Sequence, residues 1–567
     1  MIEINSDSID YIARSTRHNQ ILNDIDKKYE SVFNDNTLEK LLEVSLNSPL
    51  VSYAYKKAMC LQNFFNYKIT PFESGIEKLK VIGMVMVYPF WILAQIGIPS
   101  LSTELCKKYQ VGFMGAFSSW SLNNKYRSLD FLLNGHLSKE NTIFCIEEPI
   151  MPGEKELFTL RGYNWIELRK ILHGADIKFI YHTILKKQIS VWLSLLLKSF
   201  TEPPYITRLT LEIIYKSALW LRFLEKYHLQ HYVSTNEYLP ADVVRYIHLN
   251  RVGVKTWCYI HSCSTDDFIT PPRQDDILSP HYSYFAYHHL IVWGEKMEKY
   301  YRKHPGHIQY YDHFGCLWSE LIRIAKENPK ASEVLIAAKE KFKEQNIKKI
   351  IGVFDTSFTD KDTQFVEACP LNYKDMIAFT DGLFRLLEEF PEICILFKNK
   401  LSYNSMQIHT PEIIPYYQKL IDHPRCYFPY LETTCSDPTE ITAASDLIIS
   451  APFTSPCIEA LGAGIKAIYY DASHKFPGCY YDRIPQFVAH NYNELKDFVE
   501  YWLYKTTPEE FDTFLNEYIK GELEENIDGK AISRFREKLS VVSENDEQRP
   551  IDDVILDIYP GLRKQFV

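Results

Sequence analysis

The sequence lacks most of the short motifs that identify a catalytic or metal site directly. It contains no G-x-x-x-x-G-K-S/T loop, no G-x-G-x-x-G after a predicted strand and no G-x-S-x-G. Kinase-type, dehydrogenase-type and serine-hydrolase functions therefore have no support. The 12 cysteines form no C-x-x-C pair, and the two closest, Cys258 and Cys263, are too far apart in sequence for a zinc or thioredoxin-like motif. The D-x-D letters at Asp360 and Asp362 lie several residues beyond a predicted strand, and no D-x-D falls convincingly at a strand end, so no metal site is predicted.

Positive charge is also scarce. The 63 lysines and arginines are outnumbered by 73 aspartates and glutamates, which gives a net charge of −10. This balance disfavours a protein that mainly binds nucleic acid. The first 20 residues have no apolar core, so we expect no secretory signal and a cytoplasmic protein with reduced cysteines.

One long apolar run needs an explanation. Residues 81–101 carry no charge and are long enough to cross a membrane, but they include two prolines and two glycines. We expect a buried strand over residues 81–87, a loop, and then a helix. A membrane-surface element and a true span remain the alternatives, and residues 191–200 raise the same question at shorter length.

The rest of the chain alternates between strand-like and helix-like segments. We expect strands at residues 80–87, 142–146, 177–181, 231–235, 255–261 and 290–293, and again at 348–354, 393–397, 426–429, 447–450 and 465–470. Two successive alternating blocks predict an α/β fold with two doubly wound, Rossmann-like domains facing across a cleft. The predicted boundaries are a helical N-terminal extension at 1–70, domains at 71–330 and 331–542, and a polar tail at 543–567.

Residues 444–471 are the most informative segment. They read as a strand, a hydroxyl-rich turn, a short helix, a glycine stop and a second strand. Thr454 and Ser455 lie where the helix begins, so their hydroxyls and the free backbone N–H groups predict a phosphate site. Glu459, one turn later, is the predicted ribose ligand. The segment therefore favours a transferase that uses a nucleotide-activated donor.

Further donor-side residues follow from strand ends. Lys398 ends an apolar strand and is predicted to neutralise a leaving phosphate. Thr356 and Ser357 follow another strand and could form the near wall of the phosphate site, or could cap the next helix. His423, before a short strand, is a candidate contact to the phosphate or the base, although the alternative of a helix-terminal histidine before a turn is favoured.

The first block must supply the acceptor site and a proton acceptor. Glu237 and His261 lie just past two neighbouring predicted strands, and glutamate and histidine are usual proton acceptors for a hydroxyl. Glu147 and Glu148 follow a third strand, but adjacent side chains on a strand diverge, so they are a weaker acid–base pair. A solvated or capping role is the alternative for each of these residues.

The second block resembles the GT-B class of glycosyltransferases. The resemblance covers residues 348–504 and is carried by the SDLIIS strand, Thr454 and Ser455, and the EALG helix that begins at Glu459. The PFTSP turn and the following AIYYD are similar to bacterial surface-carbohydrate transferases, which are distantly related to Kdo transferases and CDP-glycerol glycerophosphotransferases. The first block resembles these proteins only in outline.

The resemblance implies a metal-independent sugar transfer with no cofactor, from a nucleotide-sugar donor that could be CMP- or CDP-activated. The implied acceptor is a glycan of a lipopolysaccharide, a capsule or a related surface polymer, or a lipid-linked precursor. The implied location is the cytoplasm, with peripheral contact at the inner membrane. The alternative is a nucleotide-sugar epimerase, or a non-catalytic nucleotide-sugar-binding protein in glycan assembly.

Overall fold

A computed structural model describes fourteen segments of the chain, all of them between residues 71 and 539. They are residues 71–98, 106–114, 126–127, 139–147, 158–160, 162–181, 184, 189–200, 204–235, 243–263, 287–303, 308–358, 371–432 and 437–539. The predicted N-terminal extension (1–70) and polar tail (543–567) lie outside these segments.

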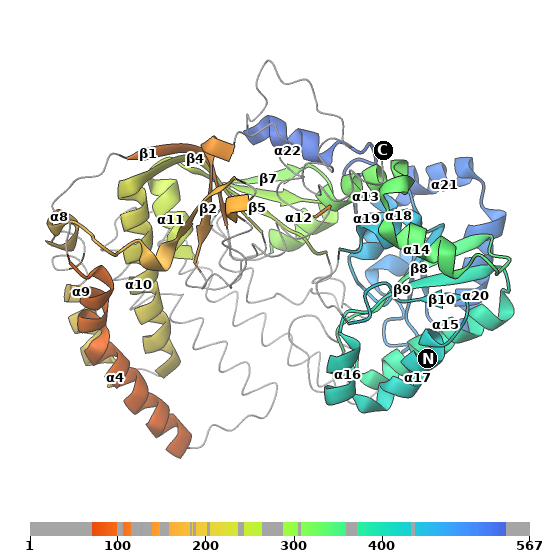
Figure 1. Ribbon diagram of the computed structural model, residues 1–567, viewed down its shortest axis with the longest axis horizontal. Helices are drawn as coiled ribbons and strands as arrows, with labels where there is room; N and C mark the ends of the chain where they lie inside the picture. Colours follow the sequence, from red (N-terminus) through yellow and green to blue (C-terminus); the bar gives the residue numbers. More distant parts are fainter. Residues whose placement is uncertain are drawn as a thin grey trace.

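The described residues form two lobes, each built around a parallel sheet (Figure 1). The first lobe has the strand order β3-β2-β1-β4-β5-β6-β7 and the second has β10-β9-β8-β11-β12-β13. In both lobes the chain adds strands first on one side of its starting strand (β1 or β8) and then on the other side, as in doubly wound folds. The predicted fold class, two Rossmann-like α/β lobes, is confirmed.

The first sheet comprises β1 (Lys107–Met114), β2 (Thr142–Ile146), β3 (Asn164–Glu167), β4 (Tyr227–Thr235), β5 (Lys255–Tyr259), β6 (His289–Val292) and β7 (Tyr310–His313). Its helices include α4 (Pro71–Ile96), α8 (Ile177–Phe179), α9 (Ile189–Lys198), α10 (Pro204–Lys226), α11 (Val243–Arg251) and α12 (Glu295–Tyr301).

The second sheet comprises β8 (Lys349–Phe354), β9 (Ile393–Lys398), β10 (Cys426–Tyr427), β11 (Leu447–Ser450), β12 (Lys466–Tyr470) and β13 (Val488–Ala489). The remaining helices are α13 (Leu317–Glu327), α14 (Glu333–Lys341), α15 (Tyr373–Glu389), α16 (Tyr403–His409), α17 (Ile414–Ile421), α18 (Thr439–Ala444), α19 (Pro456–Gly462), α20 (Tyr492–Glu500), α21 (Pro508–Phe514) and α22 (Ala531–Leu539).

The second sheet is buried on both faces, which explains its continuous apolar strands. All six residues of β9 and all four of β11 are buried. Such strands read as uninterrupted apolar runs because helices cover both sides of a parallel sheet. The predicted strands of this lobe all correspond to observed ones, and only the two-residue β13 was missed.

Two predicted strands of the first lobe are wrong. Residues 80–87 belong to helix α4, and residues 177–181 are helical around α8. The apolar run of α4 packs one face against α9 and α10, so its apolar residues meet a helical layer and not a sheet. The strands that replace them, β1 and β3, are more polar and were not predicted. β7 was missed as well.

The chain crosses back to the first lobe at its described C-terminal end. Helix α22 lies within the span predicted for the second domain, but its Phe535 ring packs 5.7 Å from Trp257 in β5 and 6.1 Å from Phe314. Figure 1 shows α22 above the first sheet, next to β7. The first lobe therefore completes its core with residues from the far end of the sequence.

Candidate functional site

The carboxyl ends of three strands of the second sheet lie side by side. Phe354 at the end of β8 is in register with Lys398 of β9 on one side and with Ser450 of β11 on the other. This edge includes the point where the strand order reverses, and ligands of doubly wound sheets bind there. Lys398, together with Asp355, which directly follows β8, is therefore placed at the expected ligand edge.

Lys398 and Asp355 are both buried and share an electrostatic environment. Burial, and after it the charge of Lys400, lower the pKa of Lys398 to about 8 against the opposing effect of Asp355. Burial also raises the pKa of Asp355 to about 7, although Tyr417 and the Lys400 backbone N–H donate hydrogen bonds to its carboxylate. Because the ammonium group of Lys398 is already removed from water, it can pair with a bound anion at little further desolvation cost.

Arg127 of the first lobe reaches into this edge of the second lobe. Its guanidinium donates a hydrogen bond to the buried carboxylate of Glu459 on α19 and lies 3.6 Å from Asp437. The backbone N–H groups of Tyr126 and Arg127 each donate to the same Asp437 carboxylate at 3.0 Å. The guanidinium also lies over the ring of Trp318, 5.4 Å from its centroid. The predicted ribose ligand, Glu459, is thus paired with a first-lobe cation.

Burial raises the pKa of Glu459, and Arg127 opposes that effect. Burial of Arg127 would in turn lower its own pKa, but Glu459 and Asp437 raise it overall. The pair is therefore an ion pair of buried charges in which each partner depends on the other. The sequence did not single out Arg127 or Asp437, because neither follows a predicted strand.

His261 follows β5 by two residues and is partly buried, on the first-lobe side of the same site. Burial lowers its pKa to about 3, helped by the positive charges of Arg127 and Lys400. The imidazole is therefore neutral at physiological pH. The influence of a first-lobe and a second-lobe cation on one ring places His261 between the lobes.

Ser455 also connects the lobes. Its hydroxyl lies 2.9 Å from that of Ser262 and accepts a hydrogen bond from the backbone N–H of Cys263 at 3.1 Å. Ser455 is buried, whereas Thr454 is half-buried and donates its hydroxyl hydrogen to the carbonyl of Ala451. The two predicted phosphate ligands thus lie at the interlobe contact, with Ser455 engaged by the first lobe.

Thr356 and Ser357 follow Asp355 at the same edge and are partly exposed. His423 is not at this edge. It precedes β10, contacts Glu388 at the end of α15, and accepts a hydrogen bond from the Arg425 backbone N–H. It therefore lies at the amino ends of the strands, and the structure separates it from the other donor-side candidates.

Glu147 has a structural environment that argues against a catalytic role. Its carboxylate accepts hydrogen bonds from Arg245 and from the indole of Trp220, and it pairs with Lys216 at 3.1 Å. Burial alone would raise its pKa, but Arg245 and Lys216 lower it overall. A carboxylate paired with two cations is a poor proton acceptor, and here it joins α10 and α11 to β2. The remaining candidate base, Glu237, lies outside the described residues.

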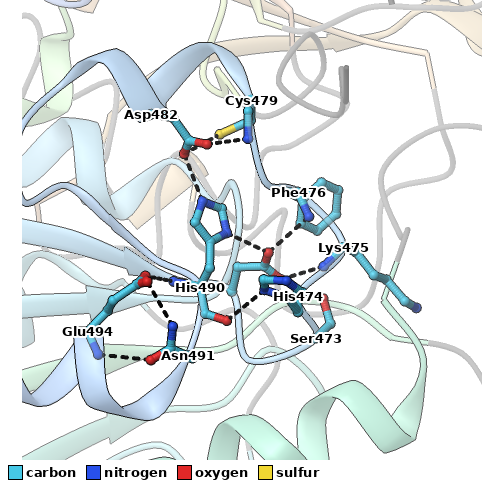
Figure 2. A network of polar contacts seen from close by, with 11 residues as sticks. Ser473, His474, Lys475, Phe476, Cys479, Asp482, His490, Asn491 and Glu494 are labelled. Atoms are coloured by element: carbon cyan, nitrogen blue, oxygen red, sulfur yellow. Dashed lines mark hydrogen bonds and ion pairs between the residues drawn. The ribbon is translucent and has the colours of Figure 1, made fainter. Parts of the chain in front are cut away.

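A second polar network lies at the ends of β12 and β13 (Figure 2). The ring of His490 bridges two carboxylates, those of Asp471 at 2.9 Å and Asp482 at 2.8 Å. Burial would lower the pKa of His490, but the two carboxylates raise it to about 9. The Asp471 carboxylate also accepts hydrogen bonds from the hydroxyl of Ser473 and the backbone N–H of Phe476. This network holds the loop after β12 against β13. Within the described segments, no three histidine, cysteine or acidic side chains are grouped as metal ligands would be.

Comparison with known proteins gives one family match. Residues 184–499, more than half of the chain, match the family described as "Polysaccharide biosynthesis PFTS motif protein". No curated protein shows significant sequence similarity to the chain.

Several solved structures can be superposed on the chain, with low TM-scores and low sequence identity. UDP-GlcNAc 2-epimerase from Neisseria meningitidis, bound to UDP-GlcNAc, has a TM-score of 0.42 and 11% identity over 76% of this chain and 99% of its own. The wall teichoic acid polymerase TagF has a TM-score of 0.41 and 12% identity, over 84% of this chain and 98% of its own. The α,α-trehalose 6-phosphate synthase from Burkholderia multivorans has a TM-score of 0.39 and 9% identity, over 77% of this chain and 97% of its own.

Proposed function

The chain belongs to the polysaccharide biosynthesis PFTS motif family, and from this membership and the site between its lobes we propose that it is a glycosyltransferase. It transfers a sugar from a nucleotide-activated donor to the acceptor of a surface glycan, such as a lipopolysaccharide or capsule. The donor's phosphate binds at the carboxyl edge of the second sheet, and the acceptor binds on the first lobe.

One observation carries this proposal: cations from both lobes converge on the carboxyl edge of the second sheet, where Lys398 is buried, Arg127 is partly buried and Lys400 is exposed. The charges of Arg127, Lys398 and Lys400 act on one another or on His261. Glu459 and Asp437 already pair with Arg127, whereas the charge of Lys400 disfavours the charged form of Lys398, which gains from a bound anion. A diphosphate leaving group supplies that anion, and its developing charge is stabilised by pre-placed donors.

Unsatisfied polar atoms at the same strand ends support a ligand site. Asn399 Oδ1, next to Lys398, and Ser450 Oγ, at the end of β11, are buried without a hydrogen-bond partner in the protein. Buried polar atoms are seldom left unpaired in folded proteins. We therefore expect these two atoms, which lie beside a cluster of cations, to pair with a bound molecule or with water.

We assign proton transfer to His261. A neutral imidazole can accept the acceptor hydroxyl's proton, and its low pKa comes from burial and then from Arg127 and Lys400. Donor phosphate would offset both cations, so it raises the pKa of His261 toward the range in which a general base is effective. Glu237 remains the second candidate base.

The proposal includes transfer without a metal ion, because Lys398, Lys400 and Arg127 can together meet the donor's negative charge. Chelation with EDTA is then expected to leave activity unchanged. The donor proposed first is CMP- or CDP-activated, and the site of action is the cytoplasmic face of the inner membrane.

Nucleotide binding tests the donor site. We expect Lys398→Met to weaken binding of the favoured nucleotide about 10- to 100-fold, the effect of losing one hydrogen bond to a charged group. Thermal-shift and calorimetric titrations with CMP, CDP, UDP, GDP and ADP measure the effect, and Lys419→Ala is the control because Lys419 is exposed on α17. Unchanged binding by Lys398→Met would remove the proposed donor site.

Turnover tests the base. His261→Asn is expected to lower the transfer rate at least about 100-fold while leaving nucleotide affinity within about threefold, because general-base catalysis contributes that much. Glu237→Gln is measured in parallel. If only Glu237→Gln lowers turnover, the base assignment moves to Glu237. Release of free nucleotide without sugar transfer, or sugar epimerisation in the absence of an acceptor, would contradict the transferase proposal itself.

A further inference from the structure

From Val81 onward, helix α4 is apolar nearly all round, although only one of its sides packs against α9 and α10. Val81, Val85, Tyr88, Ile92 and Ile96 recur at helical spacing and are buried. This buried face contacts α9 and α10, where the Trp192 indole donates to the Val85 carbonyl at 2.6 Å and Trp91 packs 4.7 Å from Tyr215.

The opposite side of α4 is apolar as well, and it is exposed. Phe90 is 75% exposed and Leu79 72%. Ile76, Met84, Met86, Val87 and Leu93 are exposed as well, and Trp91, at the border with the packed face, is 40% exposed. A surface helix of a water-soluble domain normally carries polar residues on its outer face. From Val81 to Ile96 α4 has no charged residue at all.

Helix α9 extends the same surface. It packs against α4, and its Leu193, Leu197 and Phe200 beyond its end are exposed, with Leu197 at 74%. Figure 1 shows α4 and α9 at the end of the first lobe that lies away from the second lobe. We call the exposed apolar residues of α4 and α9, with Phe200, the apolar end face. Contiguous patches of this kind mark interaction sites.

The sequence around α9 is rich in lysine, although Asp176 and Glu202 flank the lysine-rich segment. Residues 177–201, which include α9, contain four lysines and no aspartate or glutamate, in a chain whose net charge is −10. The start of α4 is balanced, with Glu73 and Glu77 near Lys78 and Lys80, so the excess of positive charge comes from the segment that includes α9. Lysines beside apolar helices complement anionic lipid headgroups, and each lysine near such a surface contributes about 1 kcal/mol, or about fivefold in affinity.

We propose that the apolar end face docks the protein onto an anionic lipid surface, with α4 and α9 lying in the headgroup region. One helix in the described segments, Lys78–Ile96, is long and apolar enough to cross a membrane, but its packed face against α9 and α10 fits a helix that lies on the surface. A second copy of the chain is a poorer occupant. A symmetric pairing through this face would bring the two lysine-rich segments together, and interface cores are depleted in lysine.

Vesicle binding of the full-length protein tests the proposal. We expect the protein to sediment with phosphatidylcholine vesicles that contain about one third phosphatidylglycerol, and at least about tenfold less with pure phosphatidylcholine or in about 0.5 M NaCl. Phe90→Glu and Leu197→Glu are each expected to reduce binding to the anionic vesicles at least about tenfold, because an inserted apolar side chain becomes charged. Ile408→Glu is the matched control, since Ile408 is 64% exposed on α16 of the second lobe.

Three outcomes overturn the proposal: no sedimentation with anionic vesicles, equal loss of binding in Ile408→Glu, or a dimer by light scattering that Phe90→Glu converts to a monomer. Circular dichroism and nucleotide binding confirm that each variant is folded. The donor site lies on the other lobe, so nucleotide affinity is expected to be unchanged in Phe90→Glu. Failure of vesicle binding is therefore distinguishable from failure of the proposed transferase activity.

Discussion

At the scale of the residue, Arg127 shows how a single side chain joins the two lobes. Its guanidinium pairs with Glu459, which is 1% exposed, and both of them lie in a low-dielectric environment. Removal of one partner of such a pair costs more than the pair itself contributes, because the other charge is left buried. Donor binding that competes for Arg127 would have to compensate Glu459, for example through ribose hydroxyls.

The sequence allowed some of these residues to be predicted and not others. Lys398 was found because it ends a continuous apolar strand, and His261 because it follows one. Arg127 lies between strands, and its importance depends on Asp437 and Glu459, more than 300 positions away. A long-range ion pair leaves no periodic pattern in a single sequence, so it could not be predicted.

His490 gives a prediction about pH. Its folded pKa of about 9 lies above the ordinary value near 6.5, so its contribution to stability is complete below pH 6.5 and is lost as the pH rises through 9. We expect the free energy of unfolding to fall by about 2 kcal/mol more in the wild type than in His490→Gln between these pH values. Urea denaturation at pH 6.5 and 9 measures this. His409→Gln, exposed on α16, should behave as the wild type. Parallel pH dependence in wild type and His490→Gln would contradict the prediction.

At the scale of the element, the strands of the second lobe were predicted more completely than those of the first, where β2, β4, β5 and β6 were predicted and β1, β3 and β7 were not. In the second lobe, turns and glycines separate short apolar runs of strand length, and these runs became β8, β9, β11 and β12. In the first lobe, the valine- and methionine-rich run of α4 has the composition of a strand but belongs to a 26-residue helix. A short apolar run is ambiguous between strand and buried helix, and only its packing partners decide.

Two helical glycines should respond oppositely to the same substitution. A Cβ at Gly83 in α4 meets nothing within 4 Å, whereas a Cβ at Gly382 in α15 would lie 2.6 to 2.9 Å from the Tyr470 side chain. Gly83→Ala is expected to raise the free energy of unfolding by about 0.5 to 1 kcal/mol, the helix-propensity difference. Gly382→Ala is expected to lower it by about 1 to 3 kcal/mol through overpacking. Chemical denaturation measures the free energy of unfolding of both variants. Equal changes in Gly83→Ala and Gly382→Ala would refute the packing argument.

At the scale of the whole molecule, the two lobes are joined by more than the site. The Glu524 carboxylate accepts a hydrogen bond from the Cys316 backbone N–H at the start of α13, and the Arg534 guanidinium donates to the Phe314 carbonyl. Gly315 has no room for a side chain, since a Cβ there would lie 2.2 Å from the Glu524 carboxylate. These contacts hold the segment before α22 against the first lobe.

Phe535 tests this connection. Phe535→Ala is expected to lower the free energy of unfolding of the first lobe by about 3 to 5 kcal/mol, because a fully buried ring is removed from beside Trp257 and Phe314. Tryptophan fluorescence during denaturation follows the change. Glu537→Ala, exposed on the same helix, is expected to alter it by less than about 0.5 kcal/mol. A first lobe of unchanged stability in Phe535→Ala would mean that α22 is dispensable there.

The return of α22 has a consequence for synthesis. A nascent chain that has emerged as far as α14 contains every strand of the first sheet but still lacks the aromatic ring that covers Trp257. At translation rates of about 5 to 20 residues per second, the ribosome needs roughly 10 to 40 seconds to deliver the remaining segment. During that interval we expect the first-lobe core around Trp257 to be exposed to solvent. The strands of the second lobe emerge before α22, so we expect that lobe to fold before Phe535 completes the core of the first.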